Sequence, residues 1–178
     1  QQTIENFIDA RYVGTPVWGY WQNVGDAEVD GYEVELGYDA DDLRLSVGVW
    51  EADNSLNGEP LVDSNLGLGT SIGRTWLARL DGALASPRLG YGANLRYVEE
   101  VENEISATAP PKESYFVADV YLNWQATDDL GVALAVNNLF DEFYYDHATY
   151  TWLAGNFNTY VGYPAVGREI RAAVSYRF

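Results

Sequence analysis

Apolar side chains recur at every second position in segment after segment of this chain, and no stretch keeps the 3.6-residue period of an amphipathic helix. The C-terminal segment shows the pattern most clearly, because Ile170, Val174 and Tyr176 share one face and Arg171 lies on the other. Segments of the same kind cover residues 32–38, 43–49, 76–80, 89–97, 116–124 and 130–136, with a weaker one over 4–12. The chain is therefore predicted to be all-β, with about eight strands.

The connections between these strands alternate in length. Short connections are expected at residues 39–42, 86–88 and 127–129, and long ones at 14–26, 53–70, 101–113 and 141–167. This alternation is typical of an antiparallel up-and-down meander that has short turns at one end and long loops at the other. Outer-membrane barrels have this form, with tight turns in the periplasm and long loops outside the cell.

The two faces of the strands indicate which solvent each one meets. One face is apolar and ends in aromatic residues, as in the girdles of a membrane barrel; they are Tyr12, Tyr38, Tyr97, Trp124, Tyr176 and Phe178. The other face mixes small, polar and charged residues, including Gly92, Asn94, Asp119 and Arg171. The mixture suits a filled lumen, so the sequence predicts a transmembrane β-barrel. A soluble β-sandwich or a lipocalin-like barrel, with the apolar face turned inward, is the alternative.

Composition excludes several classes of function. The chain has 27 acidic and 10 basic residues and a formal net charge of −17, which opposes binding to nucleic-acid phosphates. It has no cysteine for a disulfide framework, and its 1 histidine excludes a multi-histidine metal site. The sequence contains no recognisable catalytic triad, paired-carboxylate site or nucleotide-binding glycine pattern. We therefore predict no enzymatic activity, no cofactor and no metal site.

Two motifs near the C-terminus resemble a known family. Residues 137–145 are N-N-L-F-D-E-F-Y-Y, and the last strand opens with G-R and ends with Y-R-F. In this order they resemble the end of the barrel of TonB-dependent outer-membrane receptors. The motif residues are Asn138, Leu139, Phe140, Asp141, Gly167 and Arg168, followed by Tyr176 and Phe178. Residues 23–33 resemble a passage further upstream in the same barrel, so the resemblance covers nearly the whole chain.

The resemblance implies a 22-stranded barrel that encloses an N-terminal plug domain. With about eight strands, and with neither a plug nor a TonB-box segment, residues 1–178 are expected to form one barrel segment, the last third of such a barrel. A free-standing eight-stranded barrel is the alternative. Side chains would then have to fill its lumen, and the glycine-rich inner faces look too thin for that.

The resemblance also implies a function. The intact receptor would bind a scarce nutrient, such as a ferric siderophore, haem or another large solute, and TonB would use inner-membrane energy to move the plug. The expected location is the bacterial outer membrane. The expected partners are outer-membrane lipid and lipopolysaccharide, the barrel-assembly machinery, the plug domain, TonB and the transported small molecule. A small barrel with a structural or adhesive role and a soluble carbohydrate-binding β-sandwich are the alternatives.

The last long loop contains the candidate ligand-binding residues, which are Tyr145, His147, Tyr150, Trp152 and Phe157. Some haem receptors of the family have a similar stretch with tyrosine and histidine, and either residue can bind haem iron. The aromatic rings could also stack on a flat chelate or on a sugar. A solvated histidine and a loop that packs on itself are the alternatives.

The other candidate residues are expected to have structural roles. Asn138, Leu139, Phe140 and Asp141 should shape the end of a strand and its exit into the loop, where Asp141 caps a local turn. By resemblance, Tyr176 and Phe178 form the signal that the barrel-assembly machinery recognises, and simple interfacial anchoring is the alternative. Acidic residues of the loops could bridge divalent cations to lipopolysaccharide phosphates, but they have no EF-hand spacing, which favours a solvated, salt-adapted surface.

Overall fold

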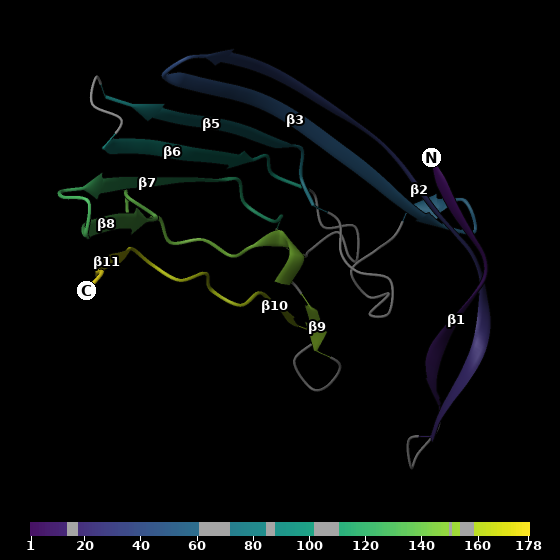
Figure 1. Cartoon of the computed structure of the whole chain (residues 1–178). Helices are drawn as coiled ribbons and strands as arrows, with labels where there is room; N and C mark the ends of the chain where they lie inside the picture. Colours follow the sequence, from purple (N-terminus) through teal and green to yellow (C-terminus); the bar gives the residue numbers. More distant parts are fainter. Residues whose placement is uncertain (14–17, 61–71, 85–87, 102–110, 150, 154–158) are drawn as a thin grey trace.

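Figure 1 shows a computed structural model of the chain, which describes residues 1–13, 18–60, 72–84, 88–101, 111–149, 151–153 and 159–178. Within these ranges, side chains are described for all residues except those that fall in 9–18 and 150–161. Every strand expected from the alternation is present. The elements are β1 (Gln2–Val13), β2 (Trp18–Ala40), β3 (Leu43–Leu56), β4 (Glu59–Pro60), β5 (Thr75–Ala83), β6 (Leu89–Val98), β7 (Tyr115–Gln125), β8 (Leu130–Asn137), the 3₁₀ turn η1 (His147–Thr149), β9 (Thr151–Leu153), β10 (Thr159–Val161) and β11 (Glu169–Tyr176).

The strands form one antiparallel sheet and one small hairpin. The main sheet has nine strands in the order β1-β2-β3-β5-β6-β7-β8-β11, with β4 paired to β3, and β9 pairs with β10. The sheet curves as a single layer (Figure 1). Within the described residues no pairing joins β1 to β11, so the sheet is open. The all-β, up-and-down architecture is confirmed, and the open sheet is that of a partial barrel.

One predicted connection is wrong. Residues 14–26 were expected to be a long loop, but β2 begins at Trp18 and pairs with Val13 of β1. The apolar alternation stops in this region because most residues between 19 and 31 are exposed on either face, and the ladder is held mainly by backbone hydrogen bonds. β2 has 23 residues, more than twice the roughly 9–11 that cross a bilayer. The paired residues 1–13 and 18–31, here called the arm, therefore extend beyond the membrane-spanning part.

A bulge bends the arm where it leaves the wall. The register between β1 and β2 shifts on either side of Phe7. Gly25 has a φ of 122°, and an added Cβ there would overlap the side chain of Asn57. Asn57 accepts a bond from the Asp26 amide at 3.0 Å and donates to the Val24 carbonyl at 2.9 Å. Gly25, in the motif of residues 23–33, is thus required by its close contact with the next hairpin.

One hydrogen-bonded row shows that the strands are staggered. The row crosses the sheet at Tyr38, Leu45, Leu80, Ala93, Val120, Val136 and Ile170. On β2 it lies two residues from the end of the strand at the short turns, and on β11 it lies six residues from that end. A row that climbs in this way requires tilted strands, which is the geometry that closes a barrel.

The apolar face of the sheet is uncovered in the described part of the chain. Leu36, Leu134 and Val174 lie on three different strands and are 73%, 45% and 71% exposed. In a sandwich these side chains would be buried against a second layer, so the predicted alternative of a soluble sandwich is wrong. Among the described residues, no helix has the length and hydropathy to span a bilayer.

The apolar face has the same height on four strands of the sheet. It covers nine residues in each of the segments 32–40, 89–97, 116–124 and 170–178. This length agrees with the roughly 9–11 residues that a tilted strand needs to cross a membrane. We call this surface the outer band; its upper edge, toward the long connections, is marked by Tyr32, Tyr97, Phe116 and Ile170.

Candidate functional site

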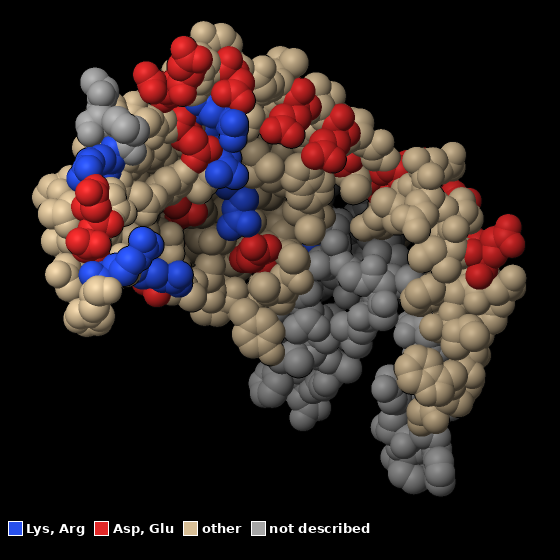
Figure 2. Space-filling model, in the orientation of Figure 1, with Lys and Arg blue, Asp and Glu red and all other residues tan. Residues whose placement is uncertain are grey.

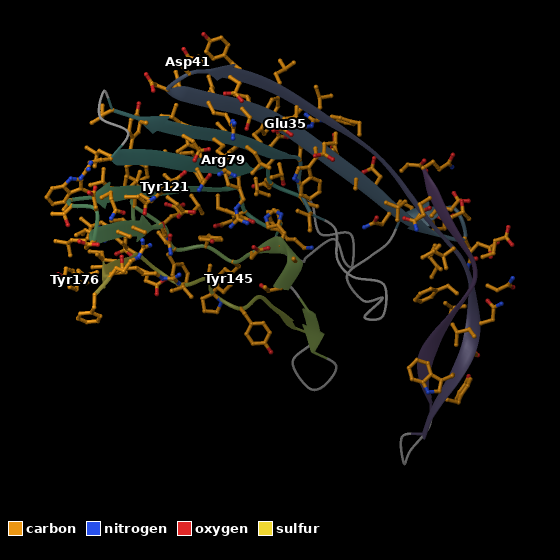
Figure 3. The ribbon with its side chains drawn as sticks, viewed as in Figure 1. Glu35, Asp41, Arg79, Tyr121, Tyr145 and Tyr176 are labelled. Atoms are coloured by element: carbon orange, nitrogen blue, oxygen red, sulfur yellow. The ribbon has the colours of Figure 1, made fainter. Side chains whose placement is uncertain are left out.

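The opposite face of the sheet is polar and hollowed. A hollow of about 530 Å³ lies on it, and its polar lining residues are Glu33, Glu35, Arg79, Asn94, Arg96 and Asp119. Figure 2 shows basic side chains in a column over this face, with acidic side chains on both sides. Figure 3 shows Glu35, Arg79 and Tyr121, which come from β2, β5 and β7. This mixture of charges is what a water-filled or domain-filled lumen requires.

The charged groups of this wall pair with one another. Arg79 donates to Asp81 on its own strand, with 2.6 Å between Nε and Oδ2, and the Tyr121 hydroxyl donates to the same carboxylate from β7. Arg171 donates to Glu169 in the same way, at 2.6 Å. Positions i and i+2 share a strand face, so both pairs lie on the lumen side. The pairs orient the side chains along the wall.

A small hydrophobic core lies at the end of the wall where the long connections meet. Val98, Tyr115 and Val117 are buried, and Ile72 and Tyr144 pack against them. The rings of Tyr115 and Tyr144 stack with their centroids 4.3 Å apart. Burial raises the pKa of the Tyr115 hydroxyl to about 12, so this group stays neutral in the core. We call these five residues the loop core.

Arg96 connects the wall to the last long loop. Its guanidinium lies 5.4 Å from the centroid of the Tyr115 ring and donates to the Tyr144 hydroxyl at 3.2 Å. The same group is 3.7 Å from the Asp146 carboxylate. Two of these contacts, with Tyr144 and Asp146, hold the start of this loop, and the third, with Tyr115, fixes Arg96 against β7.

His147 is a buried link between three connections. Its Nδ1 accepts a hydrogen bond from the Gly73 amide at 3.3 Å, and its Nε2 lies 3.0 Å from the Glu113 carbonyl, to which it donates. Its ring also meets Tyr115 edge-on at 5.4 Å. The expected alternative of a solvated histidine is wrong, because the side chain is fully buried. Both ring nitrogens bond to the backbone, so this geometry does not support iron ligation.

Of the other predicted ligand residues, only Tyr145 has a described side chain. Tyr145 is 38% exposed, and its ring contacts Phe143 at 5.4 Å in a T-shaped arrangement. Tyr144, between these two residues, packs on the lumen side against Tyr115. The side chains of Tyr150, Trp152 and Phe157 lie outside the described residues. A ligand-binding role for these three remains a prediction.

Asn138 joins the end of β8 to both ends of the last loop. Its backbone is left-handed, with a φ of 50°, and its amide N–H donates to Asp119 at 2.8 Å. Its side chain donates to the carbonyls of Glu142 and Val166 and accepts from the Glu142 amide at 2.9 Å. The side chain is almost completely buried. All of its hydrogen-bonding groups therefore serve the turn.

The rest of the motif connects this turn to β11. Asp141, with a φ of 57°, accepts a bond from the Arg168 amide at 2.8 Å, and its carboxylate lies 3.8 Å from the Arg168 guanidinium. A Cβ on Gly167 would lie 3.1 Å from the same carboxylate, which leaves little room for a larger residue. Leu139 donates to the Ala118 carbonyl at 2.7 Å. The motif N-L-F-D thus holds the loop exit and re-entry together.

The C-terminal aromatic residues lie on the outer face. Tyr176 and Phe178 are exposed, and their rings meet at 5.3 Å in a T-shaped contact. The Arg177 amide donates to Asp129 at 2.9 Å, which attaches the end of the chain to the last short turn. The role of these residues as an assembly signal stays a prediction.

The loop core was missed by the sequence analysis. Tyr144 was noticed only as part of a motif, and Tyr115 lies directly before the predicted strand over 116–124. The buried contact between them joins positions 29 residues apart. The sequence contained one local signal for this core. Tyr144 and Tyr145 are adjacent in an extended segment, so one of the two side chains has to face inward.

Comparison with known proteins identifies the family. The family model described as "TonB dependent receptor-like, beta-barrel" matches residues 1–139. The FrpB iron transporter from Neisseria meningitidis (F3-3 variant) is 29% identical, with a TM-score of 0.75, over 99% of this chain and 28% of that one. Among curated protein sequences, none matches significantly.

Two more distant structures share the fold. The copper transporter OprC is 16% identical with a TM-score of 0.73, over 99% of this chain and 28% of that one. The ferric yersiniabactin uptake receptor FyuA from Yersinia pestis is 18% identical with a TM-score of 0.68, over 89% and 25%. The chain thus spans about a quarter of the length of these proteins. TonB-dependent receptors are transporters of the bacterial outer membrane and not enzymes, and this chain belongs to their family as part of the β-barrel.

Proposed function

We propose that the chain is the C-terminal barrel portion of an outer-membrane transporter that imports an iron-containing solute, such as a ferric siderophore or haem. The observation that supports the substrate class most directly is the 29% identity with an iron transporter over 99% of the chain. The two-faced, staggered wall agrees with the transport role, because an apolar outside and a charged inside are what a solute-conducting barrel requires.

Within the intact receptor, this portion supplies wall, outer loops and the C-terminal strand. The charged inner face contacts the plug domain, whose movement is driven by TonB. The outer band contacts outer-membrane lipid and lipopolysaccharide, and Tyr176 and Phe178 are recognised by the barrel-assembly machinery. The open sheet supports this role over that of a free-standing small barrel, since its edge strands β1 and β11 are not paired with each other in the described residues.

We assign ligand contact to the aromatic part of the last loop, residues Tyr150, Trp152 and Phe157. The loop core and Arg96 hold the start of this loop at the mouth of the lumen, which favours contact with an incoming solute. Exposed rings provide stacking surfaces for flat chelates. His147 and Tyr145 are left out of this assignment because one is bonded to the backbone and the other packs on Phe143.

Uptake of radioactive iron by cells that carry the intact receptor tests the proposal. Iron-limited cells are given ⁵⁵Fe bound to a siderophore panel or as haem, with and without TonB. We expect TonB-dependent uptake of one class, lost in the triple variant Tyr150→Ala, Trp152→Ala, Phe157→Ala. The matched control replaces two exposed aromatic residues of the arm, Tyr20 and Trp21, by alanine and should keep uptake. Uptake of no iron compound, with the receptor present in the outer membrane, would refute the proposal.

A further inference from the structure

The base of the last loop continues the wall beyond the outer band. Tyr145 and Pro164 form an antiparallel bridge, and the Ala165 amide donates to the Tyr144 carbonyl at 2.9 Å. Residues 143–145 and 164–166 thus run as an extended pair on from β8 and β11. The six residues contain no charge, in a chain whose formal net charge is −17.

One side of this pair faces away from the lumen. Tyr144 packs on the lumen side against Tyr115, so its neighbours Phe143 and Tyr145 face outward. The T-shaped contact of their rings agrees with this placement. Phe143 and Val166 are 72% and 77% exposed. Side chains of this kind are seldom left in water as a contiguous group.

The outward side is continuous with the outer band. Phe140 is exposed, and its ring lies 6.0 Å from that of Phe116 at the upper edge of the band. We call Phe140, Phe143, Tyr145 and Val166 the outer patch. Val166 precedes Ile170 by four residues, which at a rise of about 3.3 Å per residue and a tilt of about 40° places it roughly 10 Å above the edge. The band itself is about 20 Å tall at the same rise and tilt, so this level lies near the upper limit of a hydrocarbon core about 30 Å thick.

The wall is different at the same position on β2 and β3. There the outer face becomes polar as soon as the band ends: Arg74 donates to Glu51 at 2.8 Å and lies 3.7 Å from Glu99, and the Tyr32 hydroxyl donates to Glu51 at 2.9 Å. An apolar surface above the band is therefore not a general property of this wall. Among the described residues that directly adjoin the band, we find it at the base of the last loop.

We propose that the outer patch inserts into the outer leaflet of the membrane and is a lipid-binding surface. Its partner is the acyl-chain boundary of the outer-leaflet lipid. Apolar continuity with the band, the absence of charge and the exposure of Phe143 and Val166 all favour lipid over water. The last loop is then held on two sides, by lipid at the outer patch and by the loop core toward the lumen. This inference rests on the outer-membrane location proposed above.

Spin labels on the intact receptor, reconstituted in bilayers and freed of other reactive cysteines, test this proposal. This portion of the chain has no cysteine, so Phe143→Cys and Val166→Cys each give one defined label site within it. Val174→Cys in the band is the lipid reference, and Asp30→Cys on the arm is the water reference. Power saturation measures collisions of each label with oxygen, which concentrates in lipid, and with a water-soluble nickel chelate.

We expect an oxygen-to-nickel ratio at both patch positions close to that at Val174, and about tenfold above that at Asp30. A ratio like that at Asp30 would show that the patch is in water and would overturn the inference. If neither oxygen nor the nickel chelate reaches the labels, another part of the receptor covers the patch. This result would also overturn the inference. Nickel access at Val174 itself would refute the membrane location, and so separates failure of the proposed function from failure of the inference.

Discussion

At the end of β8, a single side chain determines how the last loop begins. Asn138 has a φ of 50° and bonds to Glu142 and Val166. We expect Asn138→Ala to lower the free energy of unfolding by about 2–4 kcal/mol, because it leaves buried groups unpaired and puts a Cβ-bearing residue without a compensating bond at a positive φ. Asn138→Gly loses the same bonds without the strain and should cost about 1 kcal/mol less. Urea unfolding of the intact receptor in micelles measures both, and equal losses would contradict the strain argument.

Gly92 leaves space for the ring of Tyr121 on the inner wall. A Cβ at this position would overlap that ring, which reaches across to donate to Asp81. We expect Gly92→Ala to displace the ring and to destabilise the receptor by about 1–3 kcal/mol. Gly90→Ala is the matched control on the same strand face, because its Cβ would meet only the Gly82 carbonyl oxygen at 3.8 Å. Equal melting temperatures for the two variants would show that the ring yields without cost.

At this scale the sequence predicted some roles and missed others. The motif at Asn138 and Asp141 was expected at a strand exit, because asparagine and aspartate accept left-handed backbones and bond to nearby amides. The burial of His147 was not foreseen. Its bonds go to Gly73 and Glu113, in two other connections. No local pattern shows which distant loops will meet, so such contacts have to be observed.

Between elements, a row of polar side chains joins β2 and β3 to the chain before β5. The hydrogen bond from Arg74, followed by that from Tyr32, lowers the pKa of Glu51 below its ordinary value of 4.5. A lowered pKa contributes stability that is present above the ordinary value and is lost as the pH falls through the lowered one. We expect the melting temperature of the receptor to drop less between pH 7 and pH 3 in Glu51→Gln than in the unaltered protein. An identical drop in both would show that this carboxylate does not contribute.

The strands themselves were predictable where one face is buried in lipid. Alternation located the seven strands of the main path from β2 to β11, since hydrocarbon selects every second residue, and a weaker alternation located β1. The arm was not predictable in this way. Most residues between 19 and 31 are exposed on either face, so the pairing of this part of β2 with β1 and β3 leaves no apolar period to read. The bulge at Gly25 and Asn57 also depends on a contact between two hairpins.

At the scale of the whole molecule, the open sheet predicts how residues 1–178 behave when they are expressed without the rest of the receptor. Residues 1–178 expose the backbone groups of two edge strands and an apolar outer face. We expect this portion, expressed by itself, to aggregate through these edges and to show no heat-shifted band on a gel. The intact receptor should show such a band after detergent extraction. A folded, detergent-soluble monomer of residues 1–178 with a heat-shifted band would indicate a small barrel closed on itself.

The row from Tyr38 to Ile170 rises toward the long connections from one side of the sheet to the other. Each added hairpin repeats the same offset between neighbouring strands. The circumference of the barrel therefore grows by one hairpin at a time, while the height of its apolar surface stays the same. Duplication or loss of a hairpin would therefore widen or narrow the bore without disturbing the fit to the bilayer.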